Sequence, residues 1–176
     1  MHQSICSNVP VSNASPLIHL ARLGKLAYTR EAYDSLIIPP AVRTETIERG
    51  MAEGYTDASL LENLESEGWL RTRNLSNESR KPAHDLAEVV GRGEAEAIST
   101  AVELKERLSM DDHKGRRIAN FHTVRTSKTL GIMLELLVNR TITIFEYKRN
   151  VKIYSSHGWI SAEVMQEYLE RGERFE

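Results

Sequence analysis

Short apolar runs alternate along this chain with longer segments whose apolar residues recur every three or four positions. The short runs are typical of buried strands and the longer segments of amphipathic helices. Strands that alternate with helices indicate a parallel sheet with helices on both faces. The predicted strands are Val9–Ser12, Leu36–Ile38, Trp69–Arg73, Leu108–Met110 and Thr123–Arg125.

The segments between these strands are predicted to be mostly helical. Ser15 and Pro16 favour a helix start, because Ser is a common cap and Pro fits the first turn. Gly50 is interpreted as the end of a helix, and the polar stretch 74–82 as a loop. The predicted helices cover about residues 16–23, 41–49, 56–67, 85–90, 94–105, 114–120 and 131–139, with further helical patterning in the tail.

Composition limits the class of protein. The chain has 176 residues, of which 40% are hydrophobic and 27% charged, as expected for one globular domain. Its net charge of −2 provides no overall positive field to attract nucleic acid, so local basic clusters would have to do so. Cys6 is the only cysteine, and no apolar segment approaches the length of a membrane span. We expect a cytoplasmic protein without a membrane partner.

Acidic and amide side chains stand at four remote places that adjoin predicted strands or helices. They are Asn13, Glu45, Glu94 with Glu96, and Asp111 with Asp112. Ligands of parallel α/β sheets bind beyond the carboxyl ends of the strands, where Asn13 and the Asp pair are expected. Clustered carboxylates repel one another unless a cation lies among them, and Mg²⁺ prefers oxygen ligands. The pattern predicts a metal site that assists phosphodiester cleavage.

Each of these residues also has an ordinary structural explanation. Asn13 suits a turn or helix cap, and Glu45 suits a solvated helix face. Glu94 suits the first turn of a helix, and the Asp pair suits a cap. Glu94 and Glu96 are two residues apart and do not share a helix face, so at most one is expected to be a direct ligand.

Two basic groups and one glycine motif complete the candidate features. Lys114, Arg116 and Arg117 directly follow the Asp pair, and they suit either RNA phosphates or a solvated helix face. A second basic group over residues 71–81 is interpreted as solvated surface. Gly91-Arg92-Gly93 lacks the third glycine of a dinucleotide fingerprint, and no G-x-x-x-x-G-K-[ST] loop is present, which excludes nucleotide-cofactor chemistry.

Five sequence segments, in this order, resemble a known family. They are Val11-Ser-Asn-Ala-Ser-Pro-Leu-Ile18, Ile37-Ile-Pro-Pro-Ala-Val-Arg-Thr-Glu45, Gly91-Arg-Gly-Glu-Ala-Glu-Ala-Ile98, Ser109-Met-Asp-Asp-His-Lys-Gly-Arg-Arg-Ile-Ala119 and Thr126-Ser-Lys-Thr-Leu-Gly131. The set resembles PIN-domain proteins, and within them a PIN-like subgroup related to VapC-type toxins of toxin–antitoxin pairs. Gly158-Trp-Ile-Ser-Ala-Glu163 continues the likeness, which covers about residues 9–172.

The resemblance implies a three-layer α/β/α fold with a central parallel sheet of about five strands. It implies a single domain over residues 1–176, with a core over about 9–140 and a helical extension over about 145–176. It also implies an endoribonuclease that depends on Mg²⁺ or Mn²⁺ and acts as a toxin component. RNA is then the substrate, and an antitoxin protein and a second copy of the chain are the expected partners.

The family's four acids fall on identifiable positions. Asn13, Glu45, Glu94 and Asp112 are the implied catalytic residues. The implied metal ligands are Glu45, Glu94, Glu96, Asp111 and Asp112, with one member of each close pair left open. Lys114, Arg116 and Arg117 are the implied RNA contacts. Asn13 departs from the family, because an amide oxygen brings no charge to a cation. A PIN-like module with weakened catalysis, which binds RNA or a protein, is therefore the alternative.

Overall fold

The structure, a computed structural model, describes residues 8–175, so Cys6 lies outside it. Its centre is a sheet of five parallel strands in the order β3-β2-β1-β4-β5. The strands are β1 (Val11–Ser12), β2 (Leu36–Ile38), β3 (Leu70–Thr72), β4 (Leu108–Ser109) and β5 (Thr126–Ser127). The predicted parallel sheet is confirmed.

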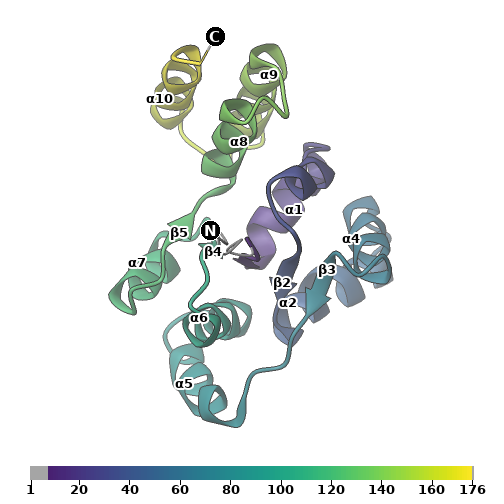
Figure 1. Cartoon of the computed structure of the whole chain (residues 1–176), viewed down its shortest axis with the longest axis vertical. Coiled ribbons are helices and arrows are strands. Elements are labelled where there is room, and N and C mark those ends of the chain that lie inside the picture. Colours follow the sequence, from purple (N-terminus) through teal and green to yellow (C-terminus); the bar gives the residue numbers. More distant parts are fainter. Residues whose placement is uncertain (1–7, 176) are drawn as a thin grey trace, which may run out of the picture.

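Helices cover both faces of the sheet and produce three layers. Those before β4 are α1 (Ala14–Arg22), η1 (Ala27–Glu31), α2 (Pro40–Arg43), η2 (Thr44–Glu48), α3 (Arg49–Ala52), α4 (Thr56–Ser66), α5 (Asn77–Ala87) and α6 (Arg92–Leu104). Those after β4 are α7 (His113–Phe121), α8 (Thr129–Val138), α9 (Ile144–Ser156) and α10 (Ala162–Glu173). Helix α1 packs against α4 and α8 on one side of the strands, and α6 packs against α5 and α7 on the other (Figure 1).

The strands are short, and their apolar residues are buried because helices cover both faces of the sheet. Val11, Ile38 and Leu108 are 0% exposed, as is Ile98 of α6, which packs against the sheet. One cluster of buried apolar side chains extends from Val11 in the first strand to Tyr168 in α10. The C-terminal helices therefore share the core of the sheet.

The helical stretch after β2 is longer than predicted, because Gly50 does not end it. Elements α2, η2 and α3 follow one another without a break from Pro40 to Ala52. A Cβ atom on Gly50 would lie 2.7 Å from the Cβ atom of Ala58 in α4. Glycine is thus required here for close packing of two helices, and its interpretation as a helix end was wrong.

The polar stretch 74–82, predicted to be a loop, largely belongs to α5. Ser76 caps this helix, since its hydroxyl oxygen accepts a hydrogen bond from the Ser79 backbone nitrogen at 3.2 Å. Pro82 lies inside the helix, although proline costs about 3 kcal/mol in a helix interior. Helix α5 packs along α6 and buries Ala83, so tertiary packing overrides the local signal.

The last strand lies three residues later than predicted. Thr123 has a φ of 62°, which is left-handed and does not continue a strand. The backbone nitrogens of Thr123 and Val124 instead bond to Asn120 and Ala119 and complete the end of α7. The pairing segment is Thr126–Ser127.

Helices α9 and α10 pack against each other and against α8. The Tyr147 hydroxyl donates a hydrogen bond to the Tyr168 carbonyl at 2.9 Å. Lys25, which follows α1, forms an ion pair with Glu146 of α9 at 2.8 Å. Within residues 8–175, none of the helices has the length and apolar character needed to cross a membrane.

Candidate active site

The candidate site lies where the strand order reverses. Strand β1 pairs with β2 on one side and with β4 on the other, and the chain leaves β1 and β4 towards opposite faces of the sheet. A crevice forms beyond the carboxyl ends of two such strands, and ligands of open α/β sheets bind there. Asn13 directly follows β1, and Asp111 and Asp112 follow β4.

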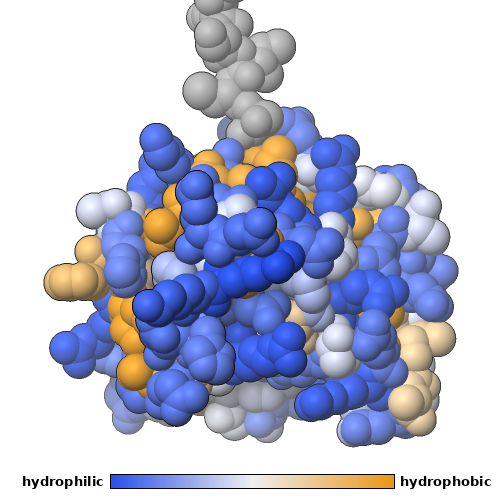
Figure 2. Space-filling model, turned by 90° about the horizontal axis from the view of Figure 1, so that it is seen from below, coloured by the Kyte–Doolittle hydropathy of each residue, from blue (hydrophilic) through white to orange (hydrophobic). Residues whose placement is uncertain are grey.

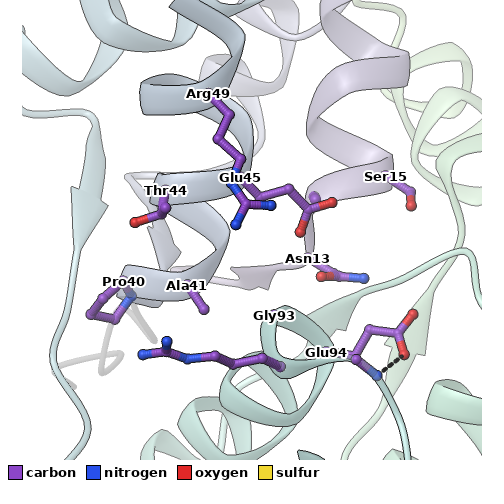
Figure 3. Close-up of a pocket in the computed structure, with 12 residues that line it drawn as sticks. Asn13, Ser15, Pro40, Ala41, Thr44, Glu45, Arg49, Gly93 and Glu94 are labelled. Carbon is purple, nitrogen blue, oxygen red and sulfur yellow. Dashed lines mark hydrogen bonds between the residues drawn. The ribbon is translucent and has the colours of Figure 1, made fainter. Parts of the chain in front are cut away.

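A cavity of about 420 Å³ opens at this point (Figure 3). It brings together three elements that are remote in sequence: the start of α1, the stretch from α2 to α3, and the start of α6. Its lining consists of Asn13, Ala14, Ser15, Pro40, Ala41, Thr44, Glu45, Arg49, Gly91, Arg92, Gly93 and Glu94. Three of the predicted site residues, Asn13, Glu45 and Glu94, thus share one cavity, which we call the carboxylate cavity.

Asn13 occupies the cap position of α1, where Ser15 was expected, but it does not act as a side-chain cap. Its side chain makes no cap hydrogen bond, and no other side-chain partner for it is found between residues 8 and 175. The residue is only 4% exposed, and its amide points into the carboxylate cavity (Figure 3). The amide is therefore available to water or to a ligand in the cavity.

Glu45 projects from η2, which is a single π-helical turn between two α-helical turns. Such turns are rare and occur frequently at functional sites. The side chain is exposed and has no hydrogen bond or ion pair within the described part of the chain. Its Oε2 atom lies 3.1 Å from the place where a Cβ atom on Gly93 would stand, and the Asn13 Oδ1 atom lies 3.8 Å from it. Both oxygens therefore lie over the start of α6.

Glu94 lies in the first turn of α6, which begins at Arg92, two residues earlier than predicted. The Gly91 backbone nitrogen donates a hydrogen bond to its Oε2 atom at 3.2 Å. Burial raises the pKa of Glu94 above its ordinary value, and the charges of Asp112 and Glu45 raise it further; the Gly91 hydrogen bond and Lys114 oppose the shift. Glu45 and Asp112 are thus each close enough to Glu94 to act on its carboxyl group.

Asp112 does not line the carboxylate cavity, although its charge acts on Glu94. It caps α7, since its Oδ2 atom accepts a hydrogen bond from the Gly115 backbone nitrogen at 2.6 Å. Asp112 is therefore a helix cap, which is the ordinary structural explanation given for it above. It is exposed, so it remains open to solvent beside Glu94.

The structure places Asp111 away from the cavity, in a network of hydrogen bonds. Its carboxylate accepts from the Thr129 backbone nitrogen at 2.8 Å and from the Thr129 hydroxyl at 2.7 Å. It also contacts the His19 Nδ1 atom at 3.0 Å and the Tyr154 hydroxyl at 3.3 Å. Burial raises the pKa of Asp111, but the hydrogen bonds to His19 and Thr129 outweigh it and hold this pKa below its ordinary value. Asp111 therefore joins β4 to α8, α1 and α9.

Glu96 also lies outside the carboxylate cavity. One of its oxygens accepts a hydrogen bond from the Ala41 backbone nitrogen at 2.8 Å, at the start of α2. The other accepts from the Arg92 Nε atom at 3.0 Å. Glu96 thus ties α6 to α2 and orients the Arg92 side chain.

The predicted basic run on α7 is only partly available to a ligand. The Lys114 ammonium donates a hydrogen bond to the Val89 carbonyl. Arg116 is half-buried, and its Nε atom is enclosed without a partner in the described residues. Arg117 alone is exposed without a side-chain hydrogen bond or ion pair there.

Two cavity arginines were not predicted as site residues. Arg49 follows Glu45 by four residues, a spacing that places both on one side of a helix, and Figure 3 shows both reaching the cavity. Arg92 stands between two glycines directly before Glu94. The spacing of Arg49 and the position of Arg92 were both visible in the sequence. Surface arginines are so common, however, that neither feature identifies a site residue.

The cavity offers a donor set that fits a hard divalent cation. Mg²⁺ keeps several waters and is held through one or two carboxylates together with substrate phosphates. The cavity lining contains carboxylate and amide oxygens but no His or Cys, the ligands typical of zinc. No group of three or more His, Cys, Asp or Glu between residues 8 and 175 is placed to hold a metal ion by itself. Asn13, Glu45 and Glu94 therefore fit a cation that keeps most of its water.

Comparison with known proteins adds one positive result. A family profile described as a PIN domain matches residues 9–174, which is nearly the whole chain. No curated protein matches the sequence.

Proposed function

This chain belongs to the PIN-domain family, and from that membership and the carboxylate cavity we propose that it is a metal-dependent endoribonuclease. PIN-domain proteins are generally nucleases that act on RNA and use divalent metals. The observation that carries the proposal is the meeting of Asn13, Glu45 and Glu94 in one cavity at the reversal of the strand order.

Glu45 and Glu94, assisted by the amide oxygen of Asn13, would hold Mg²⁺ or Mn²⁺. Such a cation polarises a scissile phosphate and lowers the pKa of a bound water. Glu45 has free oxygens for this purpose, whereas Glu94 is oriented by the Gly91 backbone. Asp112 contributes negative charge beside Glu94 and fixes the start of α7. Arg49 lies next to the carboxylates, where a guanidinium group suits a phosphate oxygen.

The test is cleavage of single-stranded RNA by the purified protein with Mn²⁺ or Mg²⁺, and with EDTA as the blank. Glu45→Gln leaves all described hydrogen bonds intact, so the variant is expected to fold and to lose activity on the order of a hundredfold, the scale typical of lost metal-positioning contacts. Asp112→Asn keeps a side chain able to cap α7 but removes the charge, and we expect it to lose activity too.

A matched control is Glu62→Gln, which changes an exposed glutamate of α4 without a described partner. This variant is expected to cut RNA as the wild type does. A wild type that cuts no RNA with either metal, or a Glu45→Gln variant that cuts equally well, would refute the ribonuclease proposal.

We further propose a toxin role for the enzyme, with an antitoxin protein as partner and a homodimer as the assembled form. The motif resemblance to VapC-type toxins supports this role. Induced expression in a bacterial host is expected to stop growth for the wild type and not for Glu45→Gln. Equal growth of the two strains at equal protein levels would contradict a toxin role, and light scattering of a monomeric mass would contradict the dimer.

Asn13 favours a second candidate function, a module that binds RNA or a protein with little turnover. The amide provides an oxygen but no charge, which weakens attraction for Mg²⁺. Asn13→Asp distinguishes the two. If metal binding and cleavage arise only in this variant, the binding module is correct; if the wild type already binds Mn²⁺ and cleaves, it is not.

A further inference from the structure

The carboxylate cavity does not end at Arg92. A second cavity of about 290 Å³ shares Pro40 and Arg92 with it, and a third of about 370 Å³ shares Arg80, Arg92 and Glu96 with the second. The second and third cavities lie between α5, α6 and the segment after β3. Together they form what we call the α5–α6 groove, whose main polar residues are Asn74, Arg80, His84, Arg92 and Glu96.

Arg92 stands at the junction between the carboxylate cavity and the groove. Its side chain is 79% exposed, and its Nε atom donates a hydrogen bond to Glu96, which favours one orientation of the guanidinium group. Glu96 in turn is held by the Ala41 backbone nitrogen. The two terminal amino groups of Arg92 have no hydrogen bond in the described part of the chain. They are oriented and available, the state in which a guanidinium binds a phosphate well.

Arg80 continues the basic path along α5. It is exposed, and its guanidinium group makes neither a hydrogen bond nor an ion pair with any residue from 8 to 175. Arg49 has the same status at the opposite side of the carboxylates. Glu88 lines only the third cavity, so the positive character ends there. Figure 2 shows that the face seen from the side where α5 lies in Figure 1 is largely hydrophilic.

We propose that a single strand of RNA crosses the carboxylate cavity from Arg49 and enters the α5–α6 groove, where Arg92 and Arg80 bind successive backbone phosphates. This inference rests on the proposed ribonuclease function. The net charge of −2 makes such a local path necessary, because most of the affinity for nucleic acid comes from phosphate contacts. Glu96 is then a positioning residue for Arg92 and not a metal ligand.

The groove competes with the basic run on α7 as the route of the strand. Lys114 already binds the Val89 carbonyl, and Arg116 is half-buried with its Nε atom enclosed. Only Arg117 remains available on that helix in the described structure, whereas Arg49, Arg92 and Arg80 form a path that is continuous with the carboxylates. The predicted RNA contacts on α7 thus provide fewer available basic side chains for an RNA strand than the groove does.

The experiment measures binding without cleavage. A fluorescein-labelled single-stranded oligoribonucleotide is titrated with protein in EDTA at several salt concentrations, and fluorescence anisotropy gives the affinity. Arg80→Gln removes one charge and no described contact, so it is expected to weaken binding about fivefold at 0.1 M salt and to reduce the slope of log K against log salt by about 0.7, the value for one phosphate on a single strand. Adding Arg92→Gln is expected to double the change in slope.

Two single variants serve as controls. Arg125→Gln changes an exposed arginine that lines neither the groove nor the carboxylate cavity, and it is expected to bind as the wild type. Arg117→Gln tests the α7 route. An unchanged slope for Arg80→Gln, or a loss of affinity in Arg117→Gln in its place, would overturn the α5–α6 groove as the binding path.

Cleavage assays with Mn²⁺ separate this inference from the proposed function. If the wild type cleaves RNA while Arg80→Gln binds as tightly as the wild type, the groove is wrong and the enzyme proposal stands. If the wild type binds RNA through Arg80 and cleaves nothing, the groove is correct and the enzyme proposal fails. A wild type that binds no single-stranded RNA contradicts both.

Discussion

Among the carboxyl groups of residues 8–175, Glu94 is the one whose pKa is raised. Its pKa is raised by burial and by the charges of Asp112 and Glu45. A folded-state pKa above the unfolded value means that the folded protein binds the proton more tightly, so stability falls as pH rises from about 4.5 through the raised pKa.

Replacement of Glu94 by Gln is expected to remove this penalty while it keeps an acceptor for the Gly91 nitrogen. In EDTA at neutral pH the variant should have a higher Tm than the wild type, and the difference should vanish below pH 4. Thermal unfolding followed by circular dichroism across pH 4–8 measures this. A variant that is less stable than the wild type at neutral pH would show that the acids do not repel one another.

Gly93 leaves room for the Glu45 carboxylate over the start of α6. A Cβ atom here would lie 3.1 Å from the Glu45 Oε2 atom, so Gly93→Ala must displace that carboxylate. We expect cleavage to fall at least tenfold, while helix propensity offsets any loss of stability by about 0.5–1 kcal/mol. Gly131→Ala in α8 is the control, because nothing lies within 4 Å of its Cβ position, and it should keep full activity. Full activity in Gly93→Ala would contradict the proposed position of Glu45.

The sequence identified the candidate residues of the cavity but not which member of each close pair lines it. Asn13, Glu45 and Glu94 stand beside strand and helix ends, so the pattern was sufficient to bring them together as candidates. The choice within each close pair depended on side-chain direction, which only packing defines: Glu96 turns to the start of α2, and Asp111 turns to α8.

At the scale of elements, one carboxylate caps the start of α9 and joins it to the segment that follows α1. Glu146 accepts from the Thr143 backbone nitrogen at 2.9 Å and from the Lys25 ammonium at 2.8 Å. The hydrogen bond from Lys25, followed by those from Thr143, lowers the pKa of Glu146 from 4.5 to about 2. A lowered pKa gives stability that is present above pH 4.5 and is lost as pH falls towards 2.

Glu146→Gln is therefore expected to reduce the free energy of unfolding by about 1 kcal/mol at neutral pH, the typical scale of a helix cap. The difference from the wild type should shrink as pH falls below 4.5. Urea unfolding at pH 7 and pH 3 measures it, with Glu62→Gln as the control without a described partner. A difference that stays constant with pH would contradict the role of the ionised carboxylate.

Elements with a strong local pattern, such as β2 and α4, lie where the sequence predicted them. The errors arose where packing opposed a local signal. Gly50 makes room for Ala58 instead of ending a helix, and Pro82 is tolerated because α5 lies along α6. Local propensity carries no information on either contact, because each contact joins two helices whose packing is known only from the folded structure.

At the scale of the whole molecule, the strand order determines where chemistry is possible. The sequence and the family resemblance predicted a parallel sheet of about five strands but not the order of those strands, which places β1 between β2 and β4. The path of the α5–α6 groove was not predictable either, because it depends on α5, whose first part, residues 77–82, was predicted to be a loop.

The most direct measurement is a crystal of the wild-type protein soaked in Mn²⁺, with an anomalous difference map collected at the manganese edge. We predict a peak inside the carboxylate cavity, within coordination distance of Glu45 and Glu94 and with the Asn13 amide oxygen facing it. The same soak of Glu45→Gln should give a much weaker peak. A map without a peak in this cavity, or with its main peak elsewhere, would contradict a metal-dependent active site at this place.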